Sequence, residues 1–207
     1  MLRMRTLPAG FIEPCLPTMA DTLPSSGPWL HESKHDGFRI IARKTGVQVK
    51  LCTRPGNDLT ERFSLIVETL ANLRTRSCII DGEAVACDDN GLAMFEPDSL
   101  SALRWQDLSV RLRLDRAGWR RSAARAPRCT QVTLRSLLVK VGPRLRWNEH
   151  IEGDGETIFR HACKLGLEGI VSKRLGSPYS SGRSRDWLKF KNPLHAAVKR
   201  EAEEEWS

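Results

Sequence analysis

The sequence predicts an α+β fold, in which short strands are combined with a few helices. Residues 29–52 contain two apolar-rich runs separated by turns at Asp36-Gly37 and Thr45-Gly46, a pattern typical of paired strands. Residues 78–87 form an apolar run interrupted by two acids and predict a buried strand. Residues 60–73 predict a helix with Thr60 as candidate N-cap, because apolar residues recur there at helical spacing: Phe63, Ile66, Val67, Leu70 and Leu73.

Further elements are predicted toward the C-terminus by the same criteria. They are helices at 133–140 and 155–166, strands at 167–173 and 187–191, a hairpin turn at 88–91 and a Gly/Ser/Pro loop at 176–186. Gly166 is placed to end the second helix as a C-cap. We divide the chain into a proline-rich extended arm (1–28), a domain (29–193) and a charged tail (194–207).

Length and composition indicate a globular protein of the cytosol. The chain has 207 residues, enough for one large domain with its own core. Its six cysteines are scattered without a C-x-x-C pair, which argues against a zinc ribbon or a disulfide framework and fits a reducing compartment. The N-terminus lacks the apolar stretch of a signal peptide, and no apolar run approaches the ~20 residues of a membrane span. We therefore expect a cytoplasmic protein with no membrane partner.

The positive charge of the chain is concentrated in one segment. The net charge is +8, which invites a nucleic-acid interpretation. Residues 97–131, however, contain eight arginines, no lysine and three aspartates, and so supply five of those eight charges. The rest of the chain is only mildly basic, and charge alone is weak support for binding nucleic acid.

The most informative motif is Lys34-His35-Asp36-Gly37-Phe38-Arg39, preceded by Glu32. Alone, a lysine two residues before Asp-Gly is usually part of a turn. Here the full pattern Glu-x-Lys-x-Asp-Gly-x-Arg resembles the nucleotide-attachment motif of ATP-dependent DNA ligases.

Four companion motifs follow in the order of that family: Arg54-Pro55-Gly56, Asp81-Gly82-Glu83, residues 168–173 (EGIVSK) and residues 187–191 (WLKFK). Each alone has an ordinary structural explanation, as a loop, a β-turn or an amphipathic edge strand. Together, in order, they are much more specific. Residues 148–191 also resemble the ligase domains of bacterial non-homologous end-joining enzymes, and the resemblance covers roughly residues 5–96 and 133–205.

The resemblance implies a fold and a reaction. The fold is that of a nucleotidyltransferase, with antiparallel sheets, flanking helices and a nucleotide cleft. In the reaction, a lysine attacks the α-phosphate of ATP, carries AMP, and passes it to a DNA 5′-phosphate before the break is sealed. The implied partners are nicked or broken double-stranded DNA and end-joining proteins, in the nucleoid of a bacterial cytoplasm.

The resemblance also implies a role for each motif residue. The catalytic residues are the nucleophile Lys34 and the phosphate-neutralising Lys189 and Lys191, which share a strand face because they are two residues apart. The nucleotide is bound by Glu32 at adenine, Arg39 and Glu83 at ribose and Arg54 near phosphate, together with Asp36, Gly37 and Lys173. Glu168 and Glu83 are the expected ligands of Mg²⁺ or Mn²⁺. A lysine attacks only as a neutral amine, a form that partial burial and nearby cations favour.

One expected motif is missing. After Asp-Gly-Glu the family has a Phe-Asp-Leu strand, whose aromatic ring stacks on adenine, and then Leu-Asp-Gly. Residues 97–131 contain neither, and arginine richness without lysine is typical of GC-rich DNA read in the wrong frame. Codons permitted for residues 110–115 (GTT CGC CTT CGA CTT GAT), shifted by one base, encode Phe-Ala-Phe-Asp-Leu, and Ile-Glu-Leu-Asp-Gly then follows in the shifted frame. We hypothesise a one-base insertion near residues 96–97, compensated near 131–133.

Several alternatives remain open. One alternative to the frameshift is genuine divergence of the segment, in which Leu108–Leu114 alternates with period two like a half-buried strand. A second alternative is a catalytically impaired remnant of such a ligase, which lacks the adenine-stacking motif and also the oligonucleotide-binding-fold domain that the family has after the fifth motif; we expect that domain to be absent, because only 16 residues follow Lys191. A related RNA ligase or capping-type nucleotidyltransferase would share the lysine motif, but the end-joining-like stretch 148–191 disfavours it.

Overall fold

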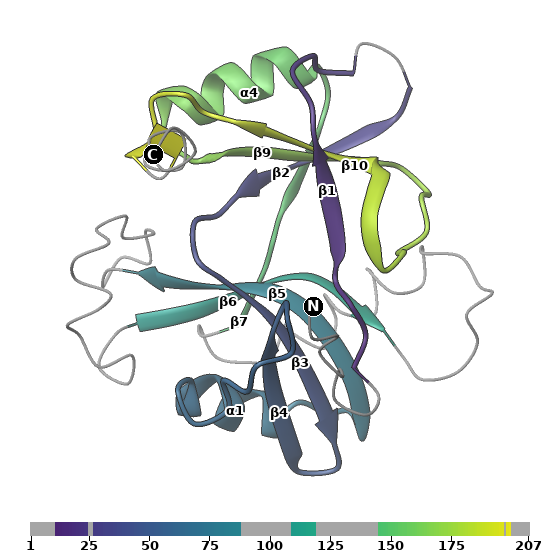
Figure 1. Cartoon of the computed structure of the whole chain (residues 1–207), viewed down its shortest axis with the longest axis vertical. Coiled ribbons are helices and arrows are strands. Elements are labelled where there is room, and N and C mark those ends of the chain that lie inside the picture. Colours follow the sequence, from purple (N-terminus) through teal and green to yellow (C-terminus); the bar gives the residue numbers. More distant parts are fainter. Residues whose placement is uncertain (1–10, 25–26, 88–108, 119–144, 197, 200–207) are drawn as a thin grey trace, which may run out of the picture.

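The computed structural model describes residues 11–24, 27–87, 109–118, 145–196 and 198–199, and these form two five-stranded sheets with two helices (Figure 1). Sheet A has the order β1 (Cys15–Met19), β10 (Gly182–Lys191), β9 (Gly169–Arg174), β2 (Trp29–Lys34) and β8 (His150–Glu152). Sheet B has the order β4 (Gln48–Thr53), β3 (Phe38–Thr45), β5 (Ser77–Cys87), β6 (Ser109–Gly118) and β7 (Leu145–Trp147). The helices are α1 (Ser64–Ala71) and α4 (Gly155–Lys164).

Most neighbouring strands are antiparallel, as expected, but each sheet contains one parallel pair. These pairs are β1 with β10 and β6 with β7. The described chain passes between the sheets twice, from β2 to β3 and from β7 to β8, and Figure 1 shows both connections between the two sheets. The lysine motif therefore lies at a crossing, because Lys34 ends β2 in sheet A and Phe38 begins β3 in sheet B.

Sheet B packs its core against α1. The predicted helical spacing is confirmed for Ile66 and Leu70, which are both buried in a cluster with β3, β4 and β5 residues. Thr60, however, is not the N-cap: the helix begins after Phe63 without a side-chain cap, and the Thr60 hydroxyl instead accepts a hydrogen bond from the Leu51 N–H (3.1 Å). A local cap preference is overridden here by packing of the turn against β4.

Sheet A packs one face against α4. The N-cap of the helix is Asp154, whose carboxylate accepts a hydrogen bond from the Thr157 N–H (3.0 Å). It ends as predicted near Gly166, which has a φ of 72° and donates to the Cys163 carbonyl, while Leu167 donates to Ala162. This pair of bonds is a Schellman motif, which satisfies carbonyls at the helix end. The apolar contacts beneath α4 involve Ala162, Ile170, Phe190, Phe159 and Leu188.

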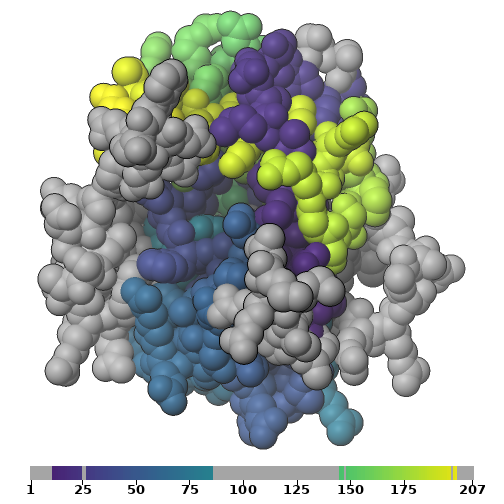
Figure 2. All heavy atoms as spheres, in the orientation of Figure 1, coloured from purple at the N-terminus to yellow at the C-terminus, as the bar shows by residue number. Residues whose placement is uncertain are grey.

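Two predicted segments are more ordered than expected. The 1–28 segment contains β1, whose Cys15 is fully buried, and the purple N-terminal segment lies against the yellow-green β10 region on the face drawn in Figure 2. The loop predicted at 176–186 is shorter, because β10 already begins at Gly182. The four cysteines with described side chains are free thiols: Cys15, Cys52, Cys78 and Cys163.

The atypical segment contributes β6, whose backbone pairs with β5 from Cys87↔Ser109 to Ile79↔Gly118. A strand at this place agrees with the period-two alternation of residues 108–114. The hairpin turn at 88–91, the helix at 133–140 and the tail beyond 199 lie outside the described residues.

Candidate active site

The register of sheet A places five charged side chains on one face. Lys34 and Lys191 both pair with Gly169 on β9. Two residues further along β9, Val171 pairs with both Glu32 and Lys189. The next row of the same parity contains Lys173, paired with Trp187 and Leu30. Because residues two apart in a strand point to the same side, one face carries Glu32, Lys34, Lys173, Lys189 and Lys191.

This charged face is turned toward sheet B, because α4 and its apolar contacts cover the opposite face (Figure 1). A cavity of about 100 Å³ lies between the sheets and is lined from both. Sheet A contributes Glu32, Lys34 and Lys173, and sheet B contributes Arg39 and Glu83. The sequence-predicted residues of the first, third and fourth motifs are thus brought together around one cleft.

The Lys34 ammonium forms an ion pair with the Glu168 carboxylate. Glu168 precedes β9 and is only 3% exposed. Its Oε1 contacts Lys34, whereas its buried Oε2 has no hydrogen-bond partner within the described part of the chain. A buried carboxylate oxygen without a hydrogen bond lowers the stability of the fold unless a cation or a hydrogen-bond donor binds to it.

Positive charge accumulates around Lys34. Burial lowers the pKa of Lys189, and the charges of Lys191, Lys34 and Arg183 lower it further, with Glu168 opposing them. These influences place Lys189 within electrostatic reach of both members of the ion pair. A group of amines at one end of a cleft is suited to bind a polyanion.

Glu32 occupies the centre of the cleft wall and is 2% exposed. Its Oε2 accepts from Lys173 Nζ (2.5 Å) and from Asn148 Nδ2 (3.0 Å). The Lys173 ammonium also lies 4.2 Å from the centroid of the Trp187 ring. Asn148 Oδ1 in turn contacts His35 Nε2 (3.0 Å), so this amide joins the two crossings between the sheets.

On the sheet B side, Arg39 is held by Asp81. Its Nε and Nη2 donate to the two carboxylate oxygens of Asp81 at 2.6 and 2.8 Å, and its Nη1 lies 3.7 Å from Glu83 Oε2. A bidentate pair of this kind fixes the plane of the guanidinium. Tyr179 Oη donates to the same carboxylate (2.7 Å).

Two comparisons establish the family of this chain. Residues 15–110 match the family model described as ATP dependent DNA ligase domain. The chain is also 34% identical over 177 residues to the "Multifunctional non-homologous end joining protein LigD" of Pseudomonas aeruginosa. The chain belongs to the ATP-dependent DNA ligase family. The match to the family model ends at residue 110, inside the atypical segment 97–131.

Solved ligase structures share this fold. The ligase domain from M. tuberculosis LigD has a TM-score of 0.71 and 27% identity, and covers 87% of this chain. The mycobacterial DNA ligase D complexed with ATP and MES has a TM-score of 0.70 and 27% identity. This ligase chain spans 60% of the M. tuberculosis ligase-domain chain and 21% of the Pseudomonas protein.

Three predicted residues lie away from the centre of the ligase cleft. Arg54 is exposed in the turn after β4, and Asp36 lies in the turn of the lysine motif. Gly37 has a packing role, since a Cβ there would lie 2.3 Å from the Ala84 carbonyl oxygen. Only glycine lets the crossing approach β5 so closely.

Three site residues were missed by the sequence interpretation: Asp81, Asn148 and Tyr179. Asp81 had a signal, because it shares a strand face with Glu83 two residues later. Asn148 and Tyr179 had none, because they reach the site only through the sheet arrangement.

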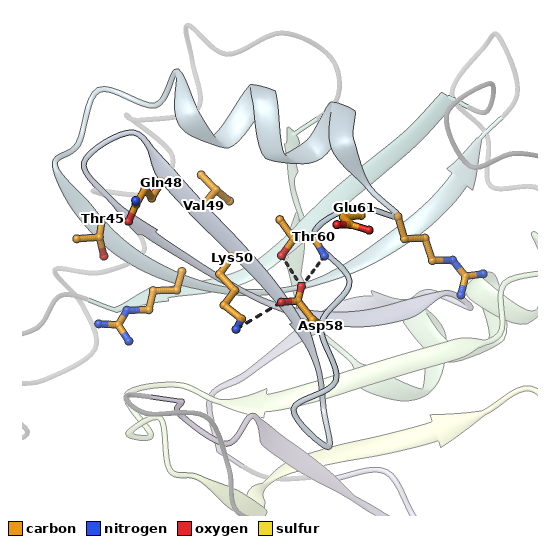
Figure 3. A pocket seen from close by; sticks show the side chains of 9 residues that line it. Thr45, Gln48, Val49, Lys50, Asp58, Thr60 and Glu61 are labelled. Atoms are coloured by element: carbon orange, nitrogen blue, oxygen red, sulfur yellow. Dashed lines mark hydrogen bonds and ion pairs between the residues drawn. The ribbon is translucent and has the colours of Figure 1, made fainter.

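A larger hollow of about 1250 Å³ lies elsewhere on the ligase surface (Figure 3). It is lined by β3, β4 and the turn before α1, and it shares no described lining residue with the cleft. Its Asp58 pairs with Lys50 at 3.4 Å, and hydrogen bonds from Thr60 lower the pKa of Asp58. The hollow contains neither the lysine motif nor its companions, so we place the chemistry in the smaller cleft.

The described residues contain no group of three or more acidic, histidine or cysteine side chains suited to hold a metal. Mg²⁺ commonly uses only one or two carboxylates together with substrate phosphates. The buried Oε2 of Glu168, which has no hydrogen-bond partner among the described residues, fits that mode of binding. Among the described helices, none is long and apolar enough to cross a membrane.

Proposed function

We propose that this chain is the nucleotidyl-transferring part of an ATP-dependent DNA ligase and that Lys34 is its nucleophile. The observation that carries the proposal is the position of Lys34, at a sheet crossing and on the same face as Lys189 and Lys191. An amine placed among further amines suits attack on a phosphate, because the neighbours stabilise the negative charge that develops.

The first step joins Lys34 to AMP. Its neutral amine attacks the α-phosphorus of ATP, a P–N bond forms, the P–O bond to pyrophosphate breaks, and the amine proton passes to solvent. Lys189 and Lys191 stabilise charge on the phosphate oxygens. A DNA 5′-phosphate oxygen then displaces the lysine from phosphorus, and finally a DNA 3′-hydroxyl displaces AMP and seals the strand.

The remaining cleft residues are assigned to the nucleotide. We place Glu32 and Lys173 at the base, and Arg39 with Glu83 at the sugar, because they line opposite walls of the cleft. Asp36 and Gly37 shape the crossing that carries Lys34. Arg54 reaches a phosphate only if its exposed turn moves toward the cleft.

Glu168, with Glu83 as second candidate, is assigned to Mg²⁺, and Mn²⁺ fits the same oxygen ligands. The ion, when bound, supplies positive charge that polarises the α-phosphate. The support is the buried Oε2 of Glu168 described above.

The substrate is nicked or broken double-stranded DNA, with end-joining proteins as partners, at the nucleoid of a bacterial cytoplasm. The support is the Pseudomonas relative, whose name contains non-homologous end joining. The preference for DNA over RNA is tested by comparing the sealing of nicked DNA duplexes with the sealing of nicked RNA duplexes.

The decisive experiment supplies α-labelled ATP and Mg²⁺ to the wild-type chain and to Lys34→Ala. We expect acid-labile, covalent label on the wild type alone, and none from γ-labelled ATP. Equal label on both chains would exclude Lys34 as the nucleophile.

A second candidate is a catalytically impaired remnant. The atypical segment 97–131 favours it, because the adenine-stacking motif is missing from the sequence there. This candidate predicts an unlabelled wild-type chain in the same assay.

A further inference from the structure

Tyr179 connects the two sheets through a single hydroxyl group. It lies between β9 and β10 of sheet A, and its Oη donates to Asp81 Oδ2 on β5 of sheet B (2.7 Å). The backbone N–H of Cys15, on β1, donates to the same Oη (3.0 Å). The hydroxyl therefore acts as donor and acceptor at once, which fixes its rotation.

Asp81 transmits this contact to the cleft. Its carboxylate is nearly completely buried and accepts from both Arg39 Nε and Arg39 Nη2. Arg39 lines the cleft, whereas Tyr179 and Asp81 are not among its lining residues. The two residues thus form a support behind the arginine, and Nη1 is left directed toward Glu83.

The ring of Tyr179 contacts the opposite wall. It packs edge-on against Trp187, with ring centroids 5.9 Å apart, and the face of Trp187 carries the Lys173 ammonium. Tyr179 therefore contacts Asp81, which holds Arg39 on one side of the cleft, and Trp187, which packs against Lys173 on the other side. Burial and the Asp81 charge raise the pKa of Tyr179, so the hydroxyl keeps its proton at neutral pH.

We propose that Tyr179 is a positioning residue, which acts through Asp81 to hold Arg39 against the sugar of the bound nucleotide. This rests on the proposed function for the identity of the nucleotide, but not for the contact itself. The phenol is needed for its hydroxyl, and the ring for packing on Trp187.

The test is Tyr179→Phe, which keeps the ring and removes the hydroxyl. The control is Thr18→Val, which removes another hydroxyl bond of 2.7 Å, to the Ser184 carbonyl, at the β1–β10 seam outside the cleft. For each chain, kcat/KM of lysine adenylylation is measured with ATP and with 2′-deoxy- and 3′-deoxy-ATP.

We expect Tyr179→Phe to raise KM for ATP roughly tenfold, the size of one hydrogen bond to a charged group. Its preference for ATP over the deoxy analogues should fall by a similar factor, while Thr18→Val keeps the wild-type preference. The same preference in both variants, even with lowered thermal midpoints, would reduce Tyr179 to a structural role and overturn the proposal.

A second measurement does not depend on activity. The Arg39 Nε–H signal should exchange slowly with solvent in the wild type and measurably faster in Tyr179→Phe, but not in Thr18→Val. Unchanged exchange in Tyr179→Phe overturns the positioning role. An unlabelled wild type with faster Arg39 exchange in Tyr179→Phe instead supports the contact and refutes only the proposed function.

Discussion

Lys34 and Glu168 face each other at the end of β2, so the proposed nucleophile and the proposed metal ligand form an ion pair. The pair links two motifs that are 134 residues apart in sequence. It also means that a change at Glu168 acts on the amine and on any cation bound there.

Glu168→Gln should therefore lower the rate of lysine adenylylation by roughly 10²–10³, the usual effect of losing one charged stabilising group. The Mg²⁺ concentration at half-maximal rate should rise as well, which is measured by titrating Mg²⁺ with α-labelled ATP. Glu156→Gln is the control, because Glu156 is 73% exposed on α4 and pairs only with nearby Arg160 among described residues. An unchanged Mg²⁺ requirement in Glu168→Gln would remove Glu168 from the metal site.

Lys189→Met should stabilise the fold while lowering activity. The pKa of Lys189 is lowered by burial and by neighbouring cations, so its charged form is held less well in the folded chain than in the unfolded one. That penalty is present while Lys189 is protonated in the folded chain and is relieved as the pH rises through its lowered pKa toward the ordinary lysine value. Thermal midpoints should show the gain at pH 7 and its decline in alkali. Lys164→Met, at an exposed position in the last turn of α4, should give no gain.

Protonation of His31 should destabilise the chain in mild acid. Burial lowers the pKa of His31, with the Gly153 backbone and Asp154 opposing, and its Nδ1 lies 2.8 Å from Ser172 Oγ. Stability is full above the unfolded value of about 6.5 and falls as the pH drops below it toward the folded value. Thermal midpoints between pH 7 and about 5 should fall less steeply in His31→Gln. A matched slope in wild type and His31→Gln would show that another group is responsible, and His150→Gln, at an exposed site, should keep the wild-type slope.

Gly37→Ala should cost about 1–3 kcal/mol of unfolding free energy, because its Cβ would overlap the Ala84 carbonyl. Denaturant unfolding measures the loss, and adenylylation should fall with it because the crossing carries Lys34. Gly46→Asn is the comparison, since Gly46 has open space around it and asparagine tolerates its φ of 62°. Equal stability of the two variants would show that the crossing can move away from β5.

Reading the coding DNA decides the frameshift hypothesis for residues 97–131. If it is right, a chain with the shifted frame restored carries Phe-Ala-Phe-Asp-Leu at positions 110–114, which pair with β5. The restored aromatic should tighten ATP binding by roughly 1–3 kcal/mol, measured by calorimetry on both chains. No shifted frame encoding that sequence would mean that the segment is genuine divergence.

The motifs predicted the fold class and the residues that meet at the cleft, because Lys34, Glu83 and Lys173 lie on elements with clear local patterns. The supports behind them were not predictable. Asn148 follows a three-residue strand and Tyr179 lies in a loop, and neither position has a periodicity that indicates its partner. Thr60 shows the opposite error, since a good local cap signal was overridden by contact with β4. Tertiary contacts between distant segments decided each of these cases.

The two crossings between the sheets have a mechanical consequence. Asn148, on one crossing, is hydrogen-bonded to His35 on the other and to the carbonyl of Ser33 near the end of β2, so the two described connections between the sheets lie side by side. A change in the angle between the two sheets would therefore move Lys34, which lies beside these connections, less than residues farther from them.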